Sequence, residues 1–259
     1  VQDIYKQTKN PTIGFTESKT NKTYYEIIDG YRANVTYLDS IYCNNPEEAT
    51  CVVRRPLIVM FDHKIDTDHF EKIIKPLVDL SMQYNTRLVV VAPYYDSMLL
   101  DLIRRQATIE FKSRNTTSVV YTRVSIANQL LQDQYNDFAI MSGCTLIKEI
   151  DLEKIEKGDV ELGEFIGQVE QMIIGHETTL IQGFTKRNEN MYQIVLNDAE
   201  KQYNQAKQRH IDMNLVNTEL YDLSQRISKL RGKVGFIYVG GGTTMEKLSN
   251  KDLVEDAIR

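Results

Sequence analysis

The chain has 259 residues, with 31 Lys and Arg against 36 Asp and Glu, which gives a formal net charge of −5. Its hydrophobic share of 42% is enough for a packed core and argues against an intrinsically disordered chain. The negative charge argues against a nucleic-acid binder, and apolar runs such as 56–61 are far too short to span a bilayer. Three cysteines without metal or redox spacing favour reduced thiols and a cytoplasmic protein.

The pattern of a covered parallel sheet begins after a polar stretch. The continuous apolar runs at 57–61 and 88–92 predict buried strands. Apolar residues at three- and four-residue steps predict a helix over 70–84, in which Pro76 either introduces a kink or marks the true start. A second helix is predicted over 96–106. This alternation of strand and helix predicts a parallel strand pair joined by a helical crossover.

The rest of the chain alternates less regularly. The segment 118–124 is predicted to be a strand, and 126–138 a helix capped by Ser125. Further predicted elements are a strand at 145–150, a hairpin of 171–174 with 178–182, two antiparallel helices within 188–231, a strand at 234–239 and a helix from the glycines at 240–242 to Arg259.

Two polar segments are candidates for chemistry. Asp62, His63, Asp66 and His69 are metal-ligand types at the end of a predicted strand, but their spacing matches no known metal motif. An Asp-rich stretch before a helix is also what N-capping requires, so we favour capping and predict no metal site. The loop 240–244, with three glycines and two threonines between a strand and a helix, could present backbone N–H groups to a phosphate. It lacks a P-loop lysine, so we favour a flexible connection there.

Several segments, in order, resemble a group I chaperonin of the GroEL type. The similarity depends on their order and spacing over nearly the whole chain, because no single motif is decisive. The segments are 37–42 (YLDSIY), 56–65 (PLIVMFDHKI), 76–78 (PLV), 88–92 (LVVVA), 143–147 (GCTLI), 178–181 (TTLI), 229–235 (KLRGKVG), 239–240 (VG) and 254–257 (VEDA). The chain resembles a divergent member of this family, and such divergence is compatible with a phage-encoded protein.

The resemblance implies an α/β fold, the chaperonin apical domain, in which helices flank a β-sandwich, together with part of an α+β intermediate domain. Residues 30–233 would be the apical, client-binding domain. Residues 1–29 and 234–259 would be two segments of the intermediate domain, with Gly240, Gly241 and Gly242 at the hinge. The nucleotide-holding equatorial domain of the family is absent, so we expect an excised part of a longer protein.

In the family, the apical domain captures non-native proteins in an apolar groove, and the same surface receives the loop of a GroES-type co-chaperonin. An exposed apolar groove binds the apolar surface of folding intermediates without sequence preference. The positions that match are Tyr37, Ile41, Tyr42, Lys75, Val78, Leu100, Arg104 and Arg105. Lys75, Arg104 and Arg105 replace apolar residues of the family pattern, so we expect a more basic groove that prefers acidic clients.

Asp256 matches the catalytic aspartate of the family, which implies that the full-length protein hydrolyses ATP with Mg²⁺ as a homo-oligomeric ring. This part alone would be monomeric and inactive on ATP. Three alternatives stay open. The first is a free-standing nucleotide- or phosphate-binding α/β enzyme that uses Gly240–Thr244. The second is a metal-dependent hydrolase that uses the Asp62–His69 segment, and the third is a helical adaptor that uses 188–231.

Overall fold

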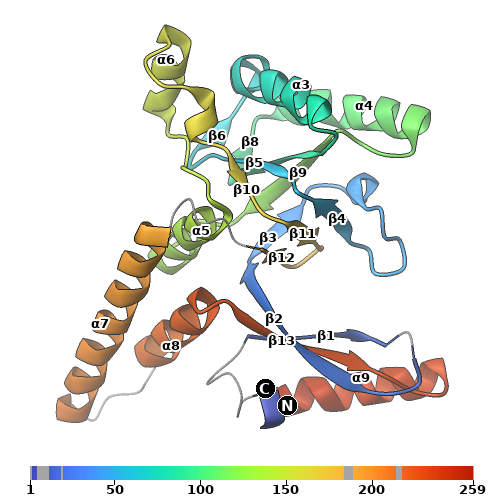
Figure 1. Ribbon diagram of the computed structural model, residues 1–259, viewed down its shortest axis with the longest axis vertical. Coiled ribbons are helices and arrows are strands. Elements are labelled where there is room, and N and C mark those ends of the chain that lie inside the picture. Colours follow the sequence, from blue (N-terminus) through green and yellow to red (C-terminus); the bar gives the residue numbers. More distant parts are fainter. Residues whose placement is uncertain (1, 5–11, 19, 184–188, 214–217, 259) are drawn as a thin grey trace. The chain divides into compact units, whose positions relative to one another are not determined.

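The protein divides into two compact units in a computed structural model, which describes residues 2–4, 12–18, 20–183, 189–213 and 218–258 (Figure 1). The first unit comprises Val1–Arg32 with Gln193–Arg259, and the second comprises Ala33–Tyr192.

A five-stranded sheet forms the centre of the second unit. Its strand order is β10 (Gly167–Gln168), β5 (Leu57–Met60), β7 (Leu88–Ala92), β9 (Val119–Val124) and β3 (Val35–Tyr37). The three middle strands are parallel, and the two edge strands are antiparallel to their neighbours. Every residue of β5 and β7 is buried, as expected for parallel strands covered on both faces. The predicted parallel pair is therefore confirmed.

Three antiparallel strands form a second sheet in this unit: β4 (Cys51–Arg54), β11 (Gln171–Ile174) and β12 (Thr179–Gln182). Strands β11 and β12 are the predicted hairpin. The Thr179 hydroxyl donates to the backbone oxygen of Val35, at 2.7 Å, and thereby joins β12 to β3 of the five-stranded sheet. A two-stranded parallel ribbon, β6 (Lys64–Ile65) with β8 (Tyr94–Tyr95), extends from the ends of β5 and β7.

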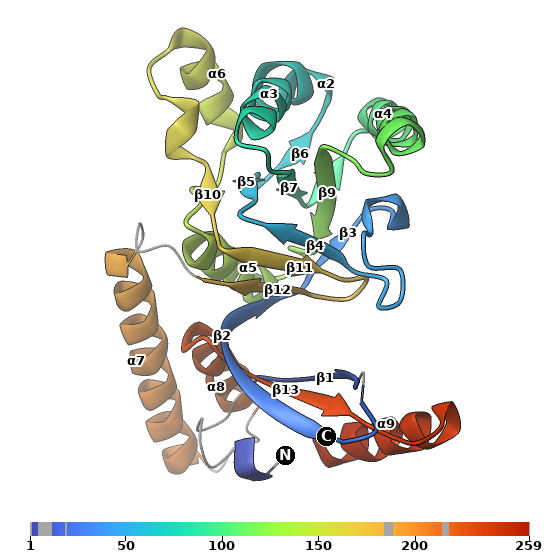
Figure 2. The same cartoon turned by 45° about the vertical axis from the view of Figure 1, so that its right-hand side comes forward.

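Helices cover the five-stranded sheet. The segments α3 (Lys75–Gln83) and α4 (Ser97–Arg114) lie on one side and α5 (Gln129–Ser142) on the other (Figures 1 and 2). A π-helical turn, η2 (Phe70–Ile74), joins the short α2 (Thr67–His69) to α3, just before Pro76. Because proline has no N–H to donate, the regular α-helical hydrogen-bond pattern cannot continue through it, so the predicted irregularity at Pro76 is confirmed. The remaining helical segments are η1 (Ser40–Tyr42), α6 (Glu149–Lys157) and η3 (Leu162–Glu164).

The first unit has a sheet in which β1 (Thr12–Glu17) is parallel to β13 (Lys233–Val239), and β13 is antiparallel to β2 (Tyr24–Ala33). Ile4, Ile237 and Val239 form its buried core, to which Val254 of α9 (Thr244–Ile258) adds a partly buried contact. Two long helices, α7 (Glu189–Met213) and α8 (Thr218–Leu230), correspond to the predicted helical pair. The link that we placed near 212–217 falls partly outside the described residues.

The boundaries between the compact units lie after Arg32 and after Tyr192, and α8 packs on β1 and β13 of the first unit. Two features differ from the predictions. The segment 145–150 is not a strand, since Ile147 makes an isolated bridge to Phe61 and α6 begins at Glu149. The cap of α5 is Asn128, whose side chain accepts a hydrogen bond from the Leu131 N–H at 2.9 Å, and not Ser125.

Candidate functional site

A groove of about 640 Å³ opens in the second unit, between η1 and α4 and beside the carboxyl ends of β7 and β9. Ligands commonly bind at this edge of a parallel sheet, because the strands end together there and the loops diverge. The groove has an apolar wall with two basic side chains, and the residues that matter for its chemistry are Leu38, Tyr42, Leu100, Ile103, Arg104 and Arg123.

The η1 wall of the groove is fixed by polar contacts at both ends. At its start, the Asp39 carboxylate accepts a hydrogen bond from the Ile41 N–H at 3.0 Å. At its end, both terminal nitrogens of Arg87 donate to the backbone oxygen of Tyr42 at 3.3 Å. The Tyr42 side chain is only 2% exposed, and burial together with the Asp39 charge raises the pKa of its hydroxyl, which therefore stays neutral.

Arg87 holds this wall to the sheet. Its Nε donates to the Thr117 backbone oxygen at 2.8 Å, and its Nη atoms also reach the Thr117 hydroxyl at 2.5 Å and the Cys51 sulfur at 3.1 Å. Burial raises the pKa of the Cys51 thiol to about 11, and the Arg87 charge offsets part of that rise. The guanidinium thus ties η1, β4 and the residues before β9 into one framework.

The predicted client-binding residues do not all meet in this groove. Tyr42, Leu100 and Arg104 line it. Tyr37 and Ile41 are half-buried in the adjoining segment, whereas Lys75 and Val78 lie on α3 and Arg105 is exposed on α4, all outside the lining.

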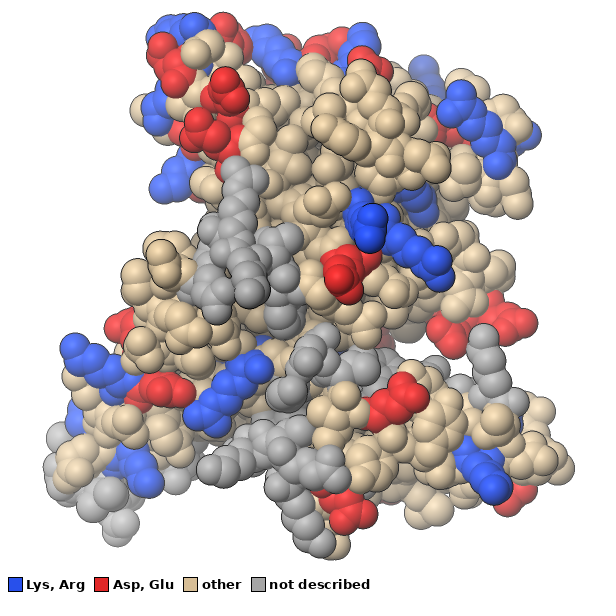
Figure 3. Space-filling view, viewed as in Figure 1, with Lys and Arg blue, Asp and Glu red and all other residues tan. Residues whose placement is uncertain are grey.

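The basic contribution expected from Lys75 is largely neutralised. Its ammonium lies 2.8 Å from the Glu71 carboxylate one turn earlier, and that hydrogen bond raises the pKa of the lysine. Arg104 and Arg105 have no ion pair within the part of the chain that the structure describes. Over α4 and α6, charged side chains gather on the face shown in Figure 3, while the surface over α3 in that view is mainly uncharged.

Sequence reasoning missed three contributors: Arg87, Arg123 and the Tyr94–Tyr95 pair. Arg123 follows the predicted strand pattern of β9, and Tyr94 and Tyr95 form β8 at the groove edge. Arg87 directly precedes β7, Tyr94 and Tyr95 follow it, and Arg123 lies near the end of β9, so only the folded sheet brings these residues together.

The glycine loop uses its backbone groups internally. The Gly240 N–H donates to the Thr23 hydroxyl at 3.0 Å, and the Gly242 N–H donates to the Glu246 carboxylate at 2.9 Å. That carboxylate stands at the start of α9, where a bound phosphate would meet like charge. A Cβ on Gly240 would also clash with the backbone at Lys22, so this glycine meets a close chain approach. These contacts disfavour the phosphate-site alternative.

Asp256 lies exposed near the end of α9. Val254, two residues earlier, packs on the core of the first unit. Because successive helical residues are about 100° apart, Asp256 is turned by about 200° from Val254 and faces away from that core. The carboxylate is therefore available to a partner outside its own unit, which is compatible with the predicted role without testing it.

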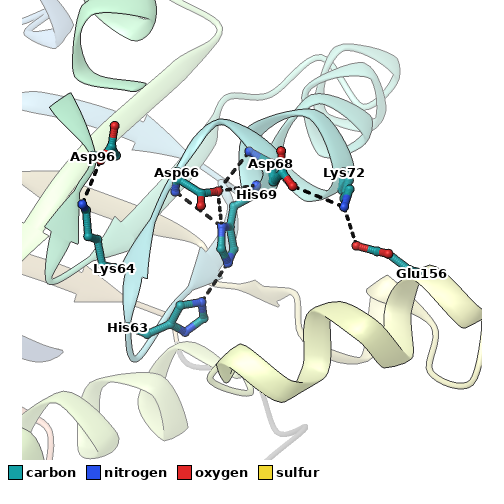
Figure 4. Close-up of polar contacts among 8 residues, drawn as sticks. All are labelled: His63, Lys64, Asp66, Asp68, His69, Lys72, Asp96 and Glu156. Atoms are coloured by element: carbon teal, nitrogen blue, oxygen red, sulfur yellow. Dashed lines mark hydrogen bonds and ion pairs between the residues drawn. The ribbon is translucent and has the colours of Figure 1, made fainter. Parts of the chain in front are cut away.

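The Asp62–His69 segment caps a helix, as favoured from the sequence. Asp66 caps α2, accepting hydrogen bonds from the N–H groups of Asp68 and His69, at 3.0 and 3.2 Å. It also contacts the His69 ring, which in turn contacts His63 (Figure 4). Burial alone would raise the pKa of Asp66, but the hydrogen bonds from His69 outweigh it and lower the value. Among the described residues, no three His, Cys, Asp or Glu side chains are arranged to hold a metal ion.

Other expectations concern the whole molecule. Cys43, Cys51 and Cys144 are all free thiols. Within the described residues, none of the helices combines the length and apolar character needed to cross a membrane.

Comparison with known proteins shows that the chain is similar to GroEL-type chaperonins, and the resemblance found in its sequence is confirmed. It is 27% identical over 256 residues to the chaperonin GroEL of Acholeplasma laidlawii (strain PG-8A), covering 98% of this chain and 44% of that protein. No family model matches the chain.

Among the solved structures that match this fold are two crystal forms of the chaperonin gp146 from the bacteriophage EL 2 (Pseudomonas aeruginosa), in the presence of ATP-BeFx. The TM-scores are 0.71 and 0.62 at 16% and 17% identity, with 96% and 99% of this chain covered. The predicted mixed α/β chaperonin fold is therefore confirmed. The chain spans a little under half the length of these relatives, 44% to 46%.

Proposed function

We propose that this chain is the client-binding part of an ATP-dependent folding chaperone and captures non-native polypeptide in the groove between η1 and α4. The observation that carries the proposal is its similarity to a GroEL chaperonin over 98% of its length. The groove supports it, since a folding intermediate exposes apolar side chains that the half-buried Leu38 and Leu100 can cover.

The charges around the groove favour acidic clients. Arg104 and Arg123 both line it and have no ion pair among the described residues. Of the described lining residues, Asp39 is the only carboxylate, and its Oδ1 is already engaged by the Ile41 N–H. An extended segment with an apolar residue next to Asp or Glu fits this arrangement, because the apolar side chain supplies affinity and the charge supplies selectivity.

The remaining functional features belong to a longer protein of this class. In it, Asp256 would act on ATP and Mg²⁺ held by another domain, subunits would assemble into a homo-oligomeric ring, and a GroES-type co-chaperonin would compete for the client groove. Gly240–Gly242 would lie at the hinge. We propose a cytoplasmic location, in keeping with the three free thiols. This part alone would bind clients without hydrolysing ATP.

Two neighbouring arginines give a matched test of the groove. Arg104 lines it and Arg105, the next residue on the same helix, does not, while both are exposed. We expect Arg104→Glu to weaken binding of an acidic, apolar peptide about tenfold, equivalent to about 1.4 kcal/mol, and Arg105→Glu to change it less than twofold. Fluorescence anisotropy with labelled peptides measures both.

A charge-neutral peptide with the same apolar residues is the control ligand, and its affinity should fall much less in Arg104→Glu. Raising the salt concentration should weaken the acidic peptide selectively, since the charges at the groove edge are screened. Equal losses in the two variants, or binding insensitive to both salt and peptide charge, would place client capture elsewhere on the chain.

A further inference from the structure

Two of the three parallel strands in the second unit's central sheet continue beyond its carboxyl edge. Strands β5, β7 and β9 lie side by side, and the ribbon of β6 with β8 extends β5 and β7 in the same parallel pairing. Within the described residues, β9 has no such extension, because it ends at Val124 and the chain continues into α5. Among the described strands, β8 therefore has a neighbour only on its β6 side.

The backbone of Tyr95 points to the open side of β8. Successive residues of a strand direct their N–H and C=O groups to opposite edges. The Asp96 N–H donates to the Ile65 backbone oxygen of β6 at 2.9 Å, so the groups of Tyr95, one residue earlier, face away from β6. Neither of these two groups forms a hydrogen bond within the part of the chain that the structure describes. Unpaired groups along a strand edge are a template for pairing with another extended chain.

The open edge of β8 borders the groove between η1 and α4. Pro93–Tyr95 and Arg123–Ser125 both line that groove. The first range contains β8 and the second follows from the end of β9, so the groove lies where a third strand of the ribbon would run. The Tyr95 hydroxyl donates to the Thr122 backbone oxygen of β9 at 2.6 Å and connects the two sides. The groove is therefore placed to receive an extended chain beside β8.

We propose that a client segment binds in this groove as an added strand, pairing its backbone with the N–H and C=O groups of Tyr95. The inference rests on the proposed function and specifies which client segments bind: those that become extended and carry an acidic residue beside apolar ones. In such strand addition the main-chain hydrogen bonds supply affinity, and pockets for alternate side chains supply specificity. A helical segment does not bind in this way, because its backbone groups are already paired within the helix.

Charge complementarity favours a client over a second copy of this chain at the β8 edge. Arg104 of α4 and Arg123 of β9 both line the groove, and neither has an ion pair with a described residue. An acidic side chain on the added strand can reach these arginines while its neighbours, which point to the opposite face, contact apolar surface. Two copies paired edge to edge through β8 would instead bring both pairs of arginines together, and like charges repel.

Peptides with an altered backbone test the added strand. The probe is a labelled peptide with one Glu among Val, Ile and Thr residues, in which one backbone N–H at a time is replaced by N–CH₃. Tyr95 offers one backbone acceptor, so methylating the nitrogen that pairs with it should weaken binding about tenfold. Methylating either neighbouring nitrogen, which points away from β8, should change the affinity less than about threefold. Fluorescence anisotropy measures the series, and the side chains are the same throughout.

Amide exchange gives a second readout, on the protein itself. By NMR, a saturating amount of the unmodified peptide should slow exchange of the Tyr95 N–H at least about tenfold, because that group gains a hydrogen-bond partner. The Asp96 N–H is the internal control, since it is already paired with Ile65 and its exchange should change less than about twofold.

The outcomes separate the added strand from client binding as such. If the unmodified peptide binds but no single nitrogen is sensitive, or Tyr95 gains no protection, the added strand is refuted while the proposed function stands. If the peptide does not bind at all, both are refuted. Dimers of the free chain in analytical ultracentrifugation, with the Tyr95 N–H protected before peptide is added, would show that a second copy occupies the edge and would also overturn the proposal.

Discussion

Replacing Arg87 by Met should weaken the attachment of η1 to the sheet and thereby the η1 wall of the proposed client groove. The substitution keeps much of the aliphatic bulk and removes every hydrogen bond from the guanidinium. The backbone oxygens of Thr117 and Tyr42 then lose donors at 2.8 and 3.3 Å. A half-buried carbonyl left without its partner costs about 1–1.5 kcal/mol, so we expect the free energy of unfolding to fall by about 2–3 kcal/mol.

Client affinity should fall as well. Within the described residues, the Tyr42 backbone oxygen accepts side-chain hydrogen bonds from Arg87 alone, so without them the end of η1 becomes free to move away from α4. Arg87→Lys should recover little of the loss, because a single ammonium cannot reach Thr117, Tyr42 and Cys51 together. Arg105→Met, an exposed change on α4, is the control for removing a positive charge.

Urea unfolding followed by circular dichroism gives the stability change, and peptide anisotropy gives the affinity. A stability loss below about 0.5 kcal/mol in Arg87→Met, or full recovery in Arg87→Lys, would refute the view that this guanidinium fixes the wall by directional hydrogen bonds.

Three further changes test the packing within the two units. Tyr135→Phe should lower the unfolding free energy by about 1–2 kcal/mol, because the buried hydroxyl donates to carbonyls after β5 and in β7, at 2.8 and 3.2 Å; an unchanged urea midpoint would contradict this. Burial raises the pKa of the Cys51 thiol from 9.0 to about 11, so the stability that the neutral thiol contributes is complete below pH 9 and is lost between pH 9 and 11. In Cys51→Ala, the free energy of unfolding should therefore change less with pH over that range. Equal pH slopes in the variant and the unsubstituted chain would contradict this. Gly240→Ala should lower the free energy of unfolding by about 1–3 kcal/mol, because the new Cβ would meet the backbone at Lys22. Gly242→Ala should lower it by less than 1 kcal/mol, because the nearest atom to its Cβ would be 3.3 Å away. The opposite order of the two thermal unfolding midpoints would refute the close-approach explanation.

The parallel sheet could be predicted from sequence because its strands are continuous apolar runs bounded by polar loops. Leu57–Met60 and Leu88–Ala92 are buried throughout, and that burial leaves a signal in composition. The helix irregularity followed from Pro76, whose effect is local. The segment 145–150 contains similar apolar residues, but only Ile147 pairs with a strand, in an isolated bridge to Phe61. No local sequence feature distinguishes such a single bridge from a full strand pairing.

The candidate site was harder to predict because its parts are distant in sequence. Tyr42, Leu100 and Arg104 were identified through the resemblance. Arg123, which lines the groove, and Arg87, which fixes its η1 wall, gave no local sign of these roles. A charge count could not foresee that Lys75 pairs with Glu71 at 2.8 Å.

The histidine pair shows the same limit. The capping role of Asp66 in the Asp62–His69 segment was correctly favoured from the sequence. It could not show that the two rings approach to 2.9 Å, since that distance depends on how the β5–α2 connection folds back.

Hydrogen exchange of the chain with and without a denatured acidic client tests the central claim most directly. The account predicts that client binding slows exchange at residues 38–42 and along the first turns of α4, with little change in α7 and α8. Protection concentrated in α7 and α8, with 38–42 and α4 unchanged, would contradict it and favour the helical-adaptor alternative.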